Sequence, residues 1–286
     1  MLSLYWVAIG YLWNSMGLLI LPQLVERLVG NSHKGLALGV LEGVGSLMAV
    51  VWQPLVGAFS DRTRTRLGRR HPFIAVGTAG DIVFLIGIAL AGSYWMLLVF
   101  YFLLQTASNT AQGPYQGLLP DVVAQPQRGQ ASGYYGLSNV VGLFTGTVVG
   151  GYILAHGGST VAILSICAVL IATALPTVLL VPDRVQPEEA QFDNVRRAVV
   201  TTFTRPLRST SFLWLMASRL LILMGLVGVQ SFIYFYFSDV FFNHEPQATT
   251  TATYTLSGIV ILSAFVISLP GARISDRVGR RPVILT

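Results

Sequence analysis

The sequence predicts an all-α protein that crosses a membrane many times, and three observations support this prediction. Hydrophobic residues make up 53% of the 286 residues and charged residues only 10%, with a mean hydropathy of +0.65, whereas a soluble domain carries about 25% charged residues. The apolar residues form runs of roughly 20, the length that crosses a bilayer as a helix. Most arginines lie in alternate connections between these runs. This composition does not fit a soluble domain, and a lipid bilayer is the expected surrounding.

Eight apolar runs have the length of a spanning helix, and the start of a ninth follows near Pro282. In chain order they are Leu4–Val25, Gly35–Phe59, Pro72–Ala91, Tyr94–Leu119, Ser132–His156, Val161–Val181, Phe212–Val240 and Thr253–Leu269. Met1 is followed directly by apolar residues, without a basic region or a cleavage site. We therefore expect the first run to remain as a span and not to be removed as a signal peptide.

The runs divide the chain into two unequal parts. Residues 1–181 are expected to form a six-helix bundle, and residues 212–286 a partial second bundle of two helices and the start of another. The connection, residues 182–211, holds apolar residues at helical spacing, which predicts a short amphipathic helix on the membrane surface. A linker without regular structure is the alternative. Because two matching halves would need four more spans, we expect the chain to be truncated.

The basic residues predict how the chain is oriented in the membrane. Fifteen arginines lie in one set of connections, whereas the opposite set holds only Arg27 and Lys34. Connections rich in arginine and lysine stay in the cytoplasm, so we expect this set and the N-terminus on the cytoplasmic side of the cell membrane. The remaining basic residue, Arg219, lies inside the seventh run. The distribution explains the net charge of +6 without a nucleic-acid partner.

One arginine-rich motif occurs twice, each time at such a connection between two apolar runs. The first copy contains Gly57, Asp61, Arg62, Gly68, Arg69 and Arg70, and the second contains Gly271, Asp276, Arg277, Gly279, Arg280 and Arg281. The duplication indicates a repeated membrane unit, of the kind found in carriers whose two halves rock around a central site.

The residue types of the motif favour a latch between helices. A glycine lets a second helix approach closely, and a carboxylate at a helix end can accept hydrogen bonds from the positive N-terminus of a neighbouring helix. We expect Arg62 to pair with a carboxylate on another helix, for which Asp121 is the candidate. Such pairs would hold the halves in one state and release them in the other. Alternatively, the paired arginines that end each copy only anchor the topology.

Polar side chains inside the predicted spans indicate a binding site for a solute. Four amides in the fourth run recur at helical spacing and cover only about 60° of the helix surface. Amides suit polyhydroxylated solutes because each has a donor and an acceptor, while hydrogen bonding between helices is the alternative. The four are Gln105, Asn109, Gln112 and Gln116, and further candidates for solute contact are Asn14, Gln53, Arg219 and Gln230.

Two acidic residues inside the predicted spans are candidates for carrying a proton. Glu42, in the second run, is the first candidate, and Asp81, in the third, is the second, because a carboxyl group enclosed by protein can exchange a proton near neutral pH. Glu42 could instead stay hydrated near the surface, and Asp81 could be paired or hydrogen-bonded locally. Arg219 could pair with either carboxylate, bind a solute hydroxyl, or extend its charged end to the membrane surface.

The other residues capable of chemistry form no catalytic pattern. The four histidines have no metal-binding spacing, and no phosphate-binding loop is present. Cys167 is the only cysteine, so no disulfide can form within the chain. We expect no metal, cofactor or enzyme activity. Gly142, Gly146 and Gly150 form a ridge that should pack against another helix.

The pattern Gly-x-x-x-Asp-Arg-x-Gly-Arg-Arg between two spans resembles the loop signature of the major facilitator superfamily. The second copy matches the Asp-Arg-x-Gly-Arg-Arg part without a gap, and the first copy has four extra residues. This longer form, with residues 53–57 before it and residues 109–114 in the fourth run, is similar to sucrose/proton symporters and to glycoside–pentoside–hexuronide:cation symporters.

The resemblance implies a major facilitator fold of twelve helices and a secondary active transporter without a cofactor. The solute would be a sugar or glycoside, moved with a proton or another cation by alternating access in the plasma membrane. In that architecture Asp61 would dock on the eleventh helix and Asp276 near the start of the fifth. Plant sucrose carriers place an acid where Gln105 stands, so proton coupling here would use another residue.

Three alternatives remain open from the sequence alone. A carrier of the same fold could export amphipathic compounds, in which case a hydrophobic surface would replace the amide stripe. A membrane receptor or scaffold is less consistent with a duplicated latch motif. The chain could also be an inactive fragment of a twelve-helix carrier.

Overall fold

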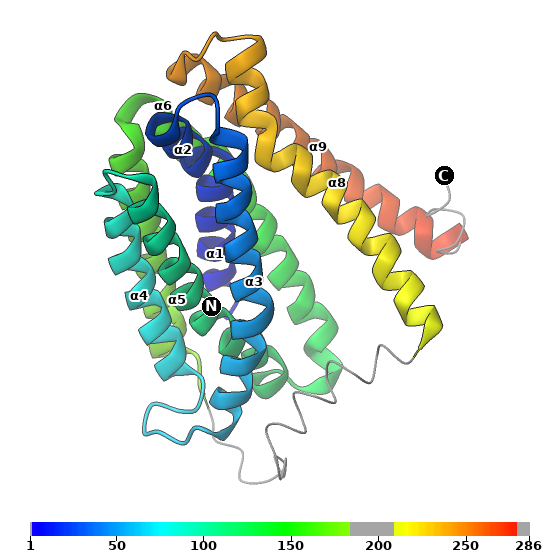
Figure 1. Ribbon diagram of the computed structural model, residues 1–286. Helices are drawn as coiled ribbons and strands as arrows, with labels where there is room; N and C mark the ends of the chain where they lie inside the picture. Colours follow the sequence, from blue (N-terminus) through cyan, green and yellow to red (C-terminus); the bar gives the residue numbers. More distant parts are fainter. Residues whose placement is uncertain (1, 184–208, 279–286) are drawn as a thin grey trace.

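The computed structural model describes residues 2–183 and 209–278, and within these ranges every regular element is a helix. The predicted all-α fold is confirmed for this part of the chain (Figure 1). The elements are α1 (Leu4–Ser15), η1 (Met16–Ile20), α2 (Leu21–Val29), α3 (Lys34–Arg62), α4 (His71–Ala89), α5 (Tyr94–Val122), η2 (Gln125–Gln127), α6 (Arg128–Leu180), α8 (Thr210–Val240) and α9 (Pro246–Val278). Most of the predicted linker and the start of the ninth span lie outside the described residues.

The eight predicted spans correspond to the observed helices. The first span, Leu4–Val29, consists of α1, the π-helical turn η1 and α2 in succession. The fifth and sixth spans are the two arms of α6, which turns back at Gly158, where φ is 77° (Figure 1). Within the described ranges six helices are long and apolar enough to cross a membrane, with α6 counted once. The 29-residue α5 is not among them, because its amides lower its hydropathy.

The first span occupies the centre of the bundle. In an apolar stretch of 18 residues within this span 72% of the residues are buried, compared with 22% in the corresponding stretch of α3. It packs against the glycine ridge of α6: a Cβ on Gly146 would lie 2.7 Å from the carbonyl oxygen of Tyr11, and a Cβ on Gly142 would overlap that of Val7. The two helices touch backbone to backbone, so the predicted role of the ridge in packing is confirmed.

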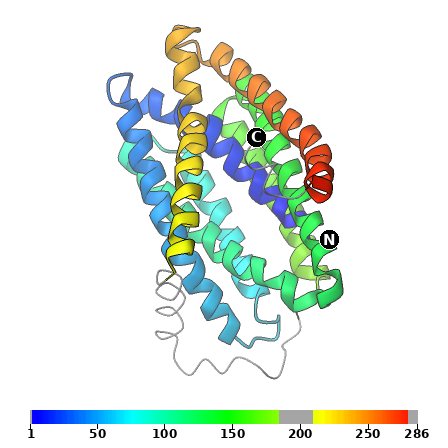
Figure 2. The same cartoon turned by 90° about the vertical axis from the view of Figure 1, so that its right-hand side faces the viewer.

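The helices fall into two groups. The first group, α1 to α6, forms a bundle, and the second group, α8 and α9, lies along one side of it (Figures 1 and 2). We call the end that holds residues 62–71 the motif end and the opposite end, with residues 30–34, the far end. The second group approaches the first at the far end and diverges from it towards the motif end (Figure 1).

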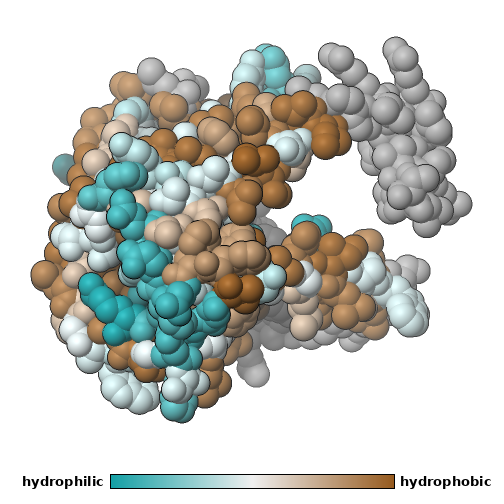
Figure 3. Space-filling model, turned by 90° about the horizontal axis from the view of Figure 1, so that it is seen from above, coloured by the Kyte–Doolittle hydropathy of each residue, from teal (hydrophilic) through white to brown (hydrophobic). Residues whose placement is uncertain are grey.

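The surface has the polarity of a protein that sits in a bilayer. Viewed from the far end, hydrophilic side chains gather over the first group and hydrophobic side chains cover much of the flanks (Figure 3). Exposed apolar residues are found on several helices, among them Leu47, Val76, Trp95 and Trp214. In the corresponding apolar stretch of α8 no residue is buried. The chain is therefore a multi-pass membrane protein.

Candidate functional site

Arg70 is the centre of a polar network at the motif end. Its Nη2 lies 2.7 Å from Asp61 Oδ1, its Nε donates to Asp121 Oδ2 at 3.0 Å, and its Nη1 donates to the hydroxyl of Ser60 at 2.8 Å. Only 6% of Arg70 is exposed. A planar guanidinium with several donors can bind such partners at once. Arg70 therefore ties the end of α3 to the end of α5.

Asp121 has different partners from the one expected. Arg69 Nη2 lies 2.7 Å from its Oδ1, and Arg70 binds its Oδ2, so Arg69 and Arg70, rather than Arg62, hold this carboxylate. The reason is position: Arg69 and Arg70 immediately precede α4, which packs against α5, whereas Arg62 belongs to the last turn of α3. In this copy the paired arginines are more than topology anchors.

Asp183, which sequence reasoning missed, caps the N-terminus of α4. Its Oδ2 accepts hydrogen bonds from the backbone nitrogens of Arg70 at 2.6 Å and His71 at 3.0 Å. Gly68 makes room for it, because φ is +99° there and a Cβ would overlap the Asp183 carboxylate. The available signal was an acid directly after the sixth span, at the same end as the motif.

Gly57 lies at a close contact between α3 and α5. A Cβ on Gly57 itself would meet none of the described atoms within 4 Å. A Cβ on Gly113 of α5 would lie 2.6 Å from the carbonyl oxygen of Gln53 and 3.3 Å from the backbone nitrogen of Gly57. The backbones of α3 and α5 are therefore in contact there, and Gly113 is the glycine whose missing Cβ permits it.

Little of the second copy of the motif is described. Gly271, Asp276 and Arg277 lie in the last turns of α9, and their side chains are outside the described part of the structure. Gly279, Arg280 and Arg281 lie outside the described residues altogether. The roles predicted for this copy, including docking by Asp276, stay predictions.

The amide stripe of α5 changes character along its length. Gln105 and Asn109 are buried, and their amides bond within the helix: Gln105 Nε2 donates to the Tyr101 hydroxyl at 2.9 Å and Asn109 Nδ2 to the Gln105 carbonyl at 2.7 Å. Gln112 is half-buried and Gln116 is exposed. The part of the stripe towards the motif end is therefore its more exposed part.

Glu42 of α3 faces the π-helical turn of the first span. A Cβ on Gly17 of that turn would lie 3.9 Å from Glu42 Oε1, and Glu42 interacts electrostatically with Tyr101 of α5. The side chain is half-buried. Because π-helical turns are frequent at functional sites, this position is consistent with the role in proton coupling predicted for Glu42. Gln53, three turns further along α3, is also half-buried.

Asp81 of α4 is fully buried and without a hydrogen-bond partner. Neither carboxylate oxygen is hydrogen-bonded to any described atom, and 0% of the residue is exposed. It interacts electrostatically with Tyr5 and Cys167, and the nearby Tyr5 hydroxyl is bonded to Thr78 Oγ1 at 2.7 Å. The local hydrogen bond that was the alternative for Asp81 is not found in the described structure.

Asn14 connects the two helix groups. Its Nδ2 donates to the Leu143 carbonyl at 2.9 Å and to Thr147 Oγ1, and its Oδ1 accepts from Gln230 Nε2 of α8 at 3.1 Å. These bonds join α1 to α6 and to α8. Asn14 and Gln230, two of the candidates for solute contact, are thus hydrogen-bonded to each other, although Gln230 is exposed.

Arg219 does not make the ion pair considered for it. It is exposed on α8, and in the described structure neither Glu42 nor Asp81 forms a salt bridge with it. Arg219 belongs to the N-terminal half of α8. Because this half diverges from the first group (Figure 1), Arg219 reaches neither carboxylate.

The described residues form a bundle of spanning helices with carboxyl and amide groups inside the spans and an arginine-centred network at one end. The chain belongs to the Major Facilitator Superfamily, whose family model matches residues 2–286. The predicted family and the major facilitator fold are thereby confirmed.

Several plant sucrose carriers are similar to parts of the chain. Sucrose transport protein SUC4 of Arabidopsis thaliana is 33% identical over 153 residues, which are 43% of this chain and 29% of the relative. Sucrose transport protein SUC3 of the same species is 30% identical over 128 residues, 37% of this chain and 22% of the relative. Sucrose transport protein SUT2 of Oryza sativa subsp. indica is 32% identical over 135 residues, 38% of this chain and 27% of the relative. The chain therefore spans less than a third of the length of these relatives.

Proposed function

We propose that this protein is a secondary active transporter that moves a small polar solute, a sugar or glycoside, by proton- or cation-coupled symport with alternating access. The observation that carries the proposal is the fully buried Asp81 carboxyl, whose oxygens have no hydrogen-bond partner among the described atoms. Ionisable groups inside a membrane are costly and typically mark ion or proton pathways. The similarity to sucrose transport proteins supports a sugar as solute.

In this proposal Asp81 and Glu42 carry the coupling ion from two different places. Asp81 is enclosed between α1, α4 and α6, whereas Glu42 is half-buried between α3, η1 and α5. A half-buried carboxyl can exchange its proton with water more readily than an enclosed one. Glu42 would therefore take up the coupling ion first. The binding of the ion at Asp81 would then depend on the side of the membrane to which the bundle is open.

The solute would meet the amides that keep exposed surface. Gln53 of α3 and Gln112 and Gln116 of α5 are half-buried or exposed, and the Asn14–Gln230 bond joins the two helix groups. Gln105 and Asn109 would act by fixing this face of α5. Amides of this kind match the donor and acceptor pattern of sugar hydroxyls.

We infer that the motif end is cytoplasmic and that the protein resides in the plasma membrane. Six arginines of the described structure lie at the motif end, namely Arg62, Arg64, Arg66, Arg69, Arg70 and Arg128, whereas Arg27 and Lys34 lie at the far end. The positive-inside rule then places the motif end, and with it the N-terminus, in the cytoplasm. Asp61, Arg70 and Asp121 would brace this end.

Transport in proteoliposomes tests the proposal. The purified protein is reconstituted, a pH gradient with acid outside is imposed, and uptake of radiolabelled sucrose and of glycosides is measured with and without a protonophore; a sodium gradient tests the other cation. We expect a gradient to accelerate uptake of at least one sugar and the protonophore to remove the effect. No response to either gradient with any sugar, together with gradient-driven movement of an amphipathic dye, would replace the symporter by an exporter.

A further inference from the structure

The far end holds a second ionic network, centred on Lys34. Lys34 is the only lysine of the chain and the first residue of α3. Its Nζ lies 2.7 Å from Glu26 Oε1 of α2 and also contacts Asp239 Oδ1 of α8. The same Nζ lies 4.9 Å from the centre of the Phe235 ring. Only 6% of the lysine side chain is exposed, so its charge depends on these partners.

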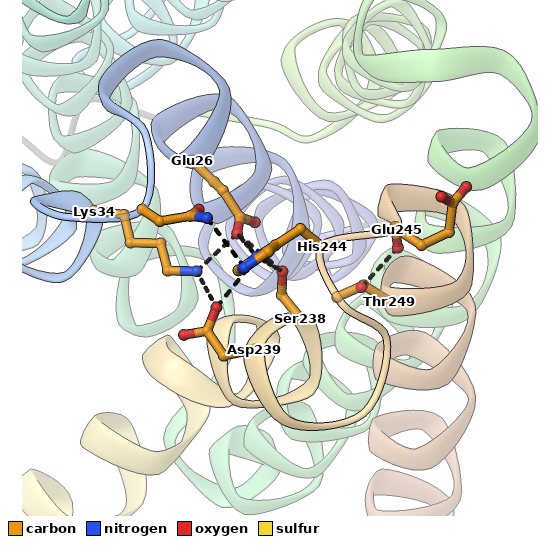
Figure 4. A network of polar contacts seen from close by, with 8 residues as sticks. Glu26, Lys34, Ser238, Asp239, His244, Glu245 and Thr249 are labelled. Carbon is orange, nitrogen blue, oxygen red and sulfur yellow. Dashed lines mark hydrogen bonds and ion pairs between the residues drawn. The ribbon is translucent and has the colours of Figure 1, made fainter.

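The network connects the two helix groups through several bonds (Figure 4). The Ser238 hydroxyl donates to Glu26 Oε1 at 2.9 Å. His244 Nδ1, in the connection between α8 and α9, lies 3.1 Å from Glu26 Oε1 and 3.3 Å from Asp239 Oδ1. Glu26 and Lys34 belong to the first group, and the other three to the second. Separating the groups at this end would break the contacts that Glu26 and Lys34 make with the second group. Lys34 would then keep Glu26 and lose Asp239 as an acceptor.

The cluster is better interpreted as a clasp than as a metal site. One ligand atom each of Glu26, Asp239 and His244 lies within 4.8 Å of the others, which is a spacing that a metal ion could use. The Lys34 ammonium, however, already binds the carboxylate oxygens that such an ion would need. An ion pair between two carboxylates and one ammonium holds the groups together without a metal.

We propose that Lys34, Glu26, Asp239, Ser238 and His244 form a far-end clasp, which keeps the far end closed while the motif end is open. The inference rests on the proposed alternating access. The second group diverges from the first at the motif end (Figure 1), so a rocking motion that closes the motif end must separate the far ends. The clasp then has to open in every transport cycle, and it sets how often the far end is accessible.

The separation of the far ends can be measured directly with two spin labels. Ser32→Cys and Gln247→Cys place labels on exposed positions of the first and second group, in a Cys167→Ala background that removes the buried native cysteine. Pulsed electron paramagnetic resonance on the full protein in lipid nanodiscs gives the distance distribution. Asp239→Asn removes one carboxylate of the clasp. Glu245→Gln is the matched control, because that side chain lies outside the clasp in the same connection (Figure 4).

We expect Asp239→Asn to add a population with a longer distance, raised at least about fivefold over the native protein, as for a typical coupling between two states. Ser238→Ala, which removes one hydrogen bond and no charge, should give a smaller increase and guards against misfolding of the charge variant. Glu245→Gln should match the native distribution. Identical distributions in all four proteins would overturn the clasp. No solute or gradient is used, so a failure of the sugar proposal leaves this result interpretable.

Discussion

The carboxylate of Asp183 accepts a hydrogen bond from the backbone nitrogen of Arg70 at 2.6 Å, across 113 residues of sequence. This bond fixes the start of α4 to the chain just beyond the second arm of α6, which ends at Leu180. The conformation of the motif is therefore set partly by a residue outside the motif. It also explains the position of Gly68, which lies against the same carboxylate.

Gly68→Ala should destabilise the protein. Its φ of +99° is unfavourable for a residue with a Cβ, and that Cβ would overlap Asp183, so we expect a loss of about 1–3 kcal/mol. Thermal unfolding in detergent measures the effect. Gly43→Ala is the control, because a Cβ on this helical glycine would have no described atom within 4 Å and the variant should lose no stability. Equal melting temperatures for both variants would contradict the prediction.

Arg70→Lys should cost more than Arg69→Lys. Arg70 contacts Asp61, Asp121 and Ser60 with three different nitrogens, while Arg69 is more exposed and contacts Asp121. A lysine ammonium cannot reproduce the planar arrangement of Arg70, and we expect a loss of roughly 2 kcal/mol for a hydrogen-bonded charge. The partly exposed Arg69 pair should account for less than about 1 kcal/mol. Thermal unfolding of both variants measures the two losses. A larger loss for Arg69→Lys than for Arg70→Lys would refute the central position of Arg70.

Gly142→Ala should weaken the contact between the first span and α6. A methyl group at this position would overlap the carbonyl oxygen of Val7, and the helices would have to separate at a cost of about 1–3 kcal/mol. Gly136→Ala lies on the same arm of α6 with no described atom within 4 Å of a Cβ, and it should leave the melting temperature unchanged. A tolerated methyl at Gly142 would mean that the helices are further apart than described.

Asp81→Asn should separate coupling from solute binding. Because neither oxygen is hydrogen-bonded to a described atom, the isosteric amide should change stability by less than about 1 kcal/mol. We expect gradient-driven accumulation of the sugar to be lost, while exchange of labelled for unlabelled sugar at equal pH continues. Both are measured in proteoliposomes, with Glu42→Gln as the comparison. Full accumulation by Asp81→Asn would remove this residue from the coupling pathway.

The spans and their packing could be predicted because the bilayer restricts the choices. Apolar length and small-residue spacing report directly on helices and their close contacts, so the eight spans and the contact at Gly142 were accessible from the sequence. The turn at Gly158 follows from the gap between the fifth and sixth runs. The family was accessible as well, since two copies of a loop motif between spans are a specific pattern.

The partners of individual side chains could not be predicted to the same extent. Asp121 is held by Arg69 and Arg70 because of how α4 lies on α5, a relation that spacing along one helix does not contain. Likewise, the amide spacing on α5 shows a common face but not that Gln105 is enclosed. The ion pair considered for Arg219 is absent from the described structure for a related reason: the path of α8 depends on the second group as a whole.

The π-helical turn Met16–Ile20 has a consequence for the opposite end of the same span. It lies between α1 and α2, and each residue of a helix advances the chain by about 100° and 1.5 Å. A π-helical turn holds one residue more than an α-helical turn, so it takes up that residue without changing the phase of α2. A deletion in the regular helix between this turn and Glu26 would instead rotate the Glu26 carboxylate by about 100° away from the Lys34 ammonium.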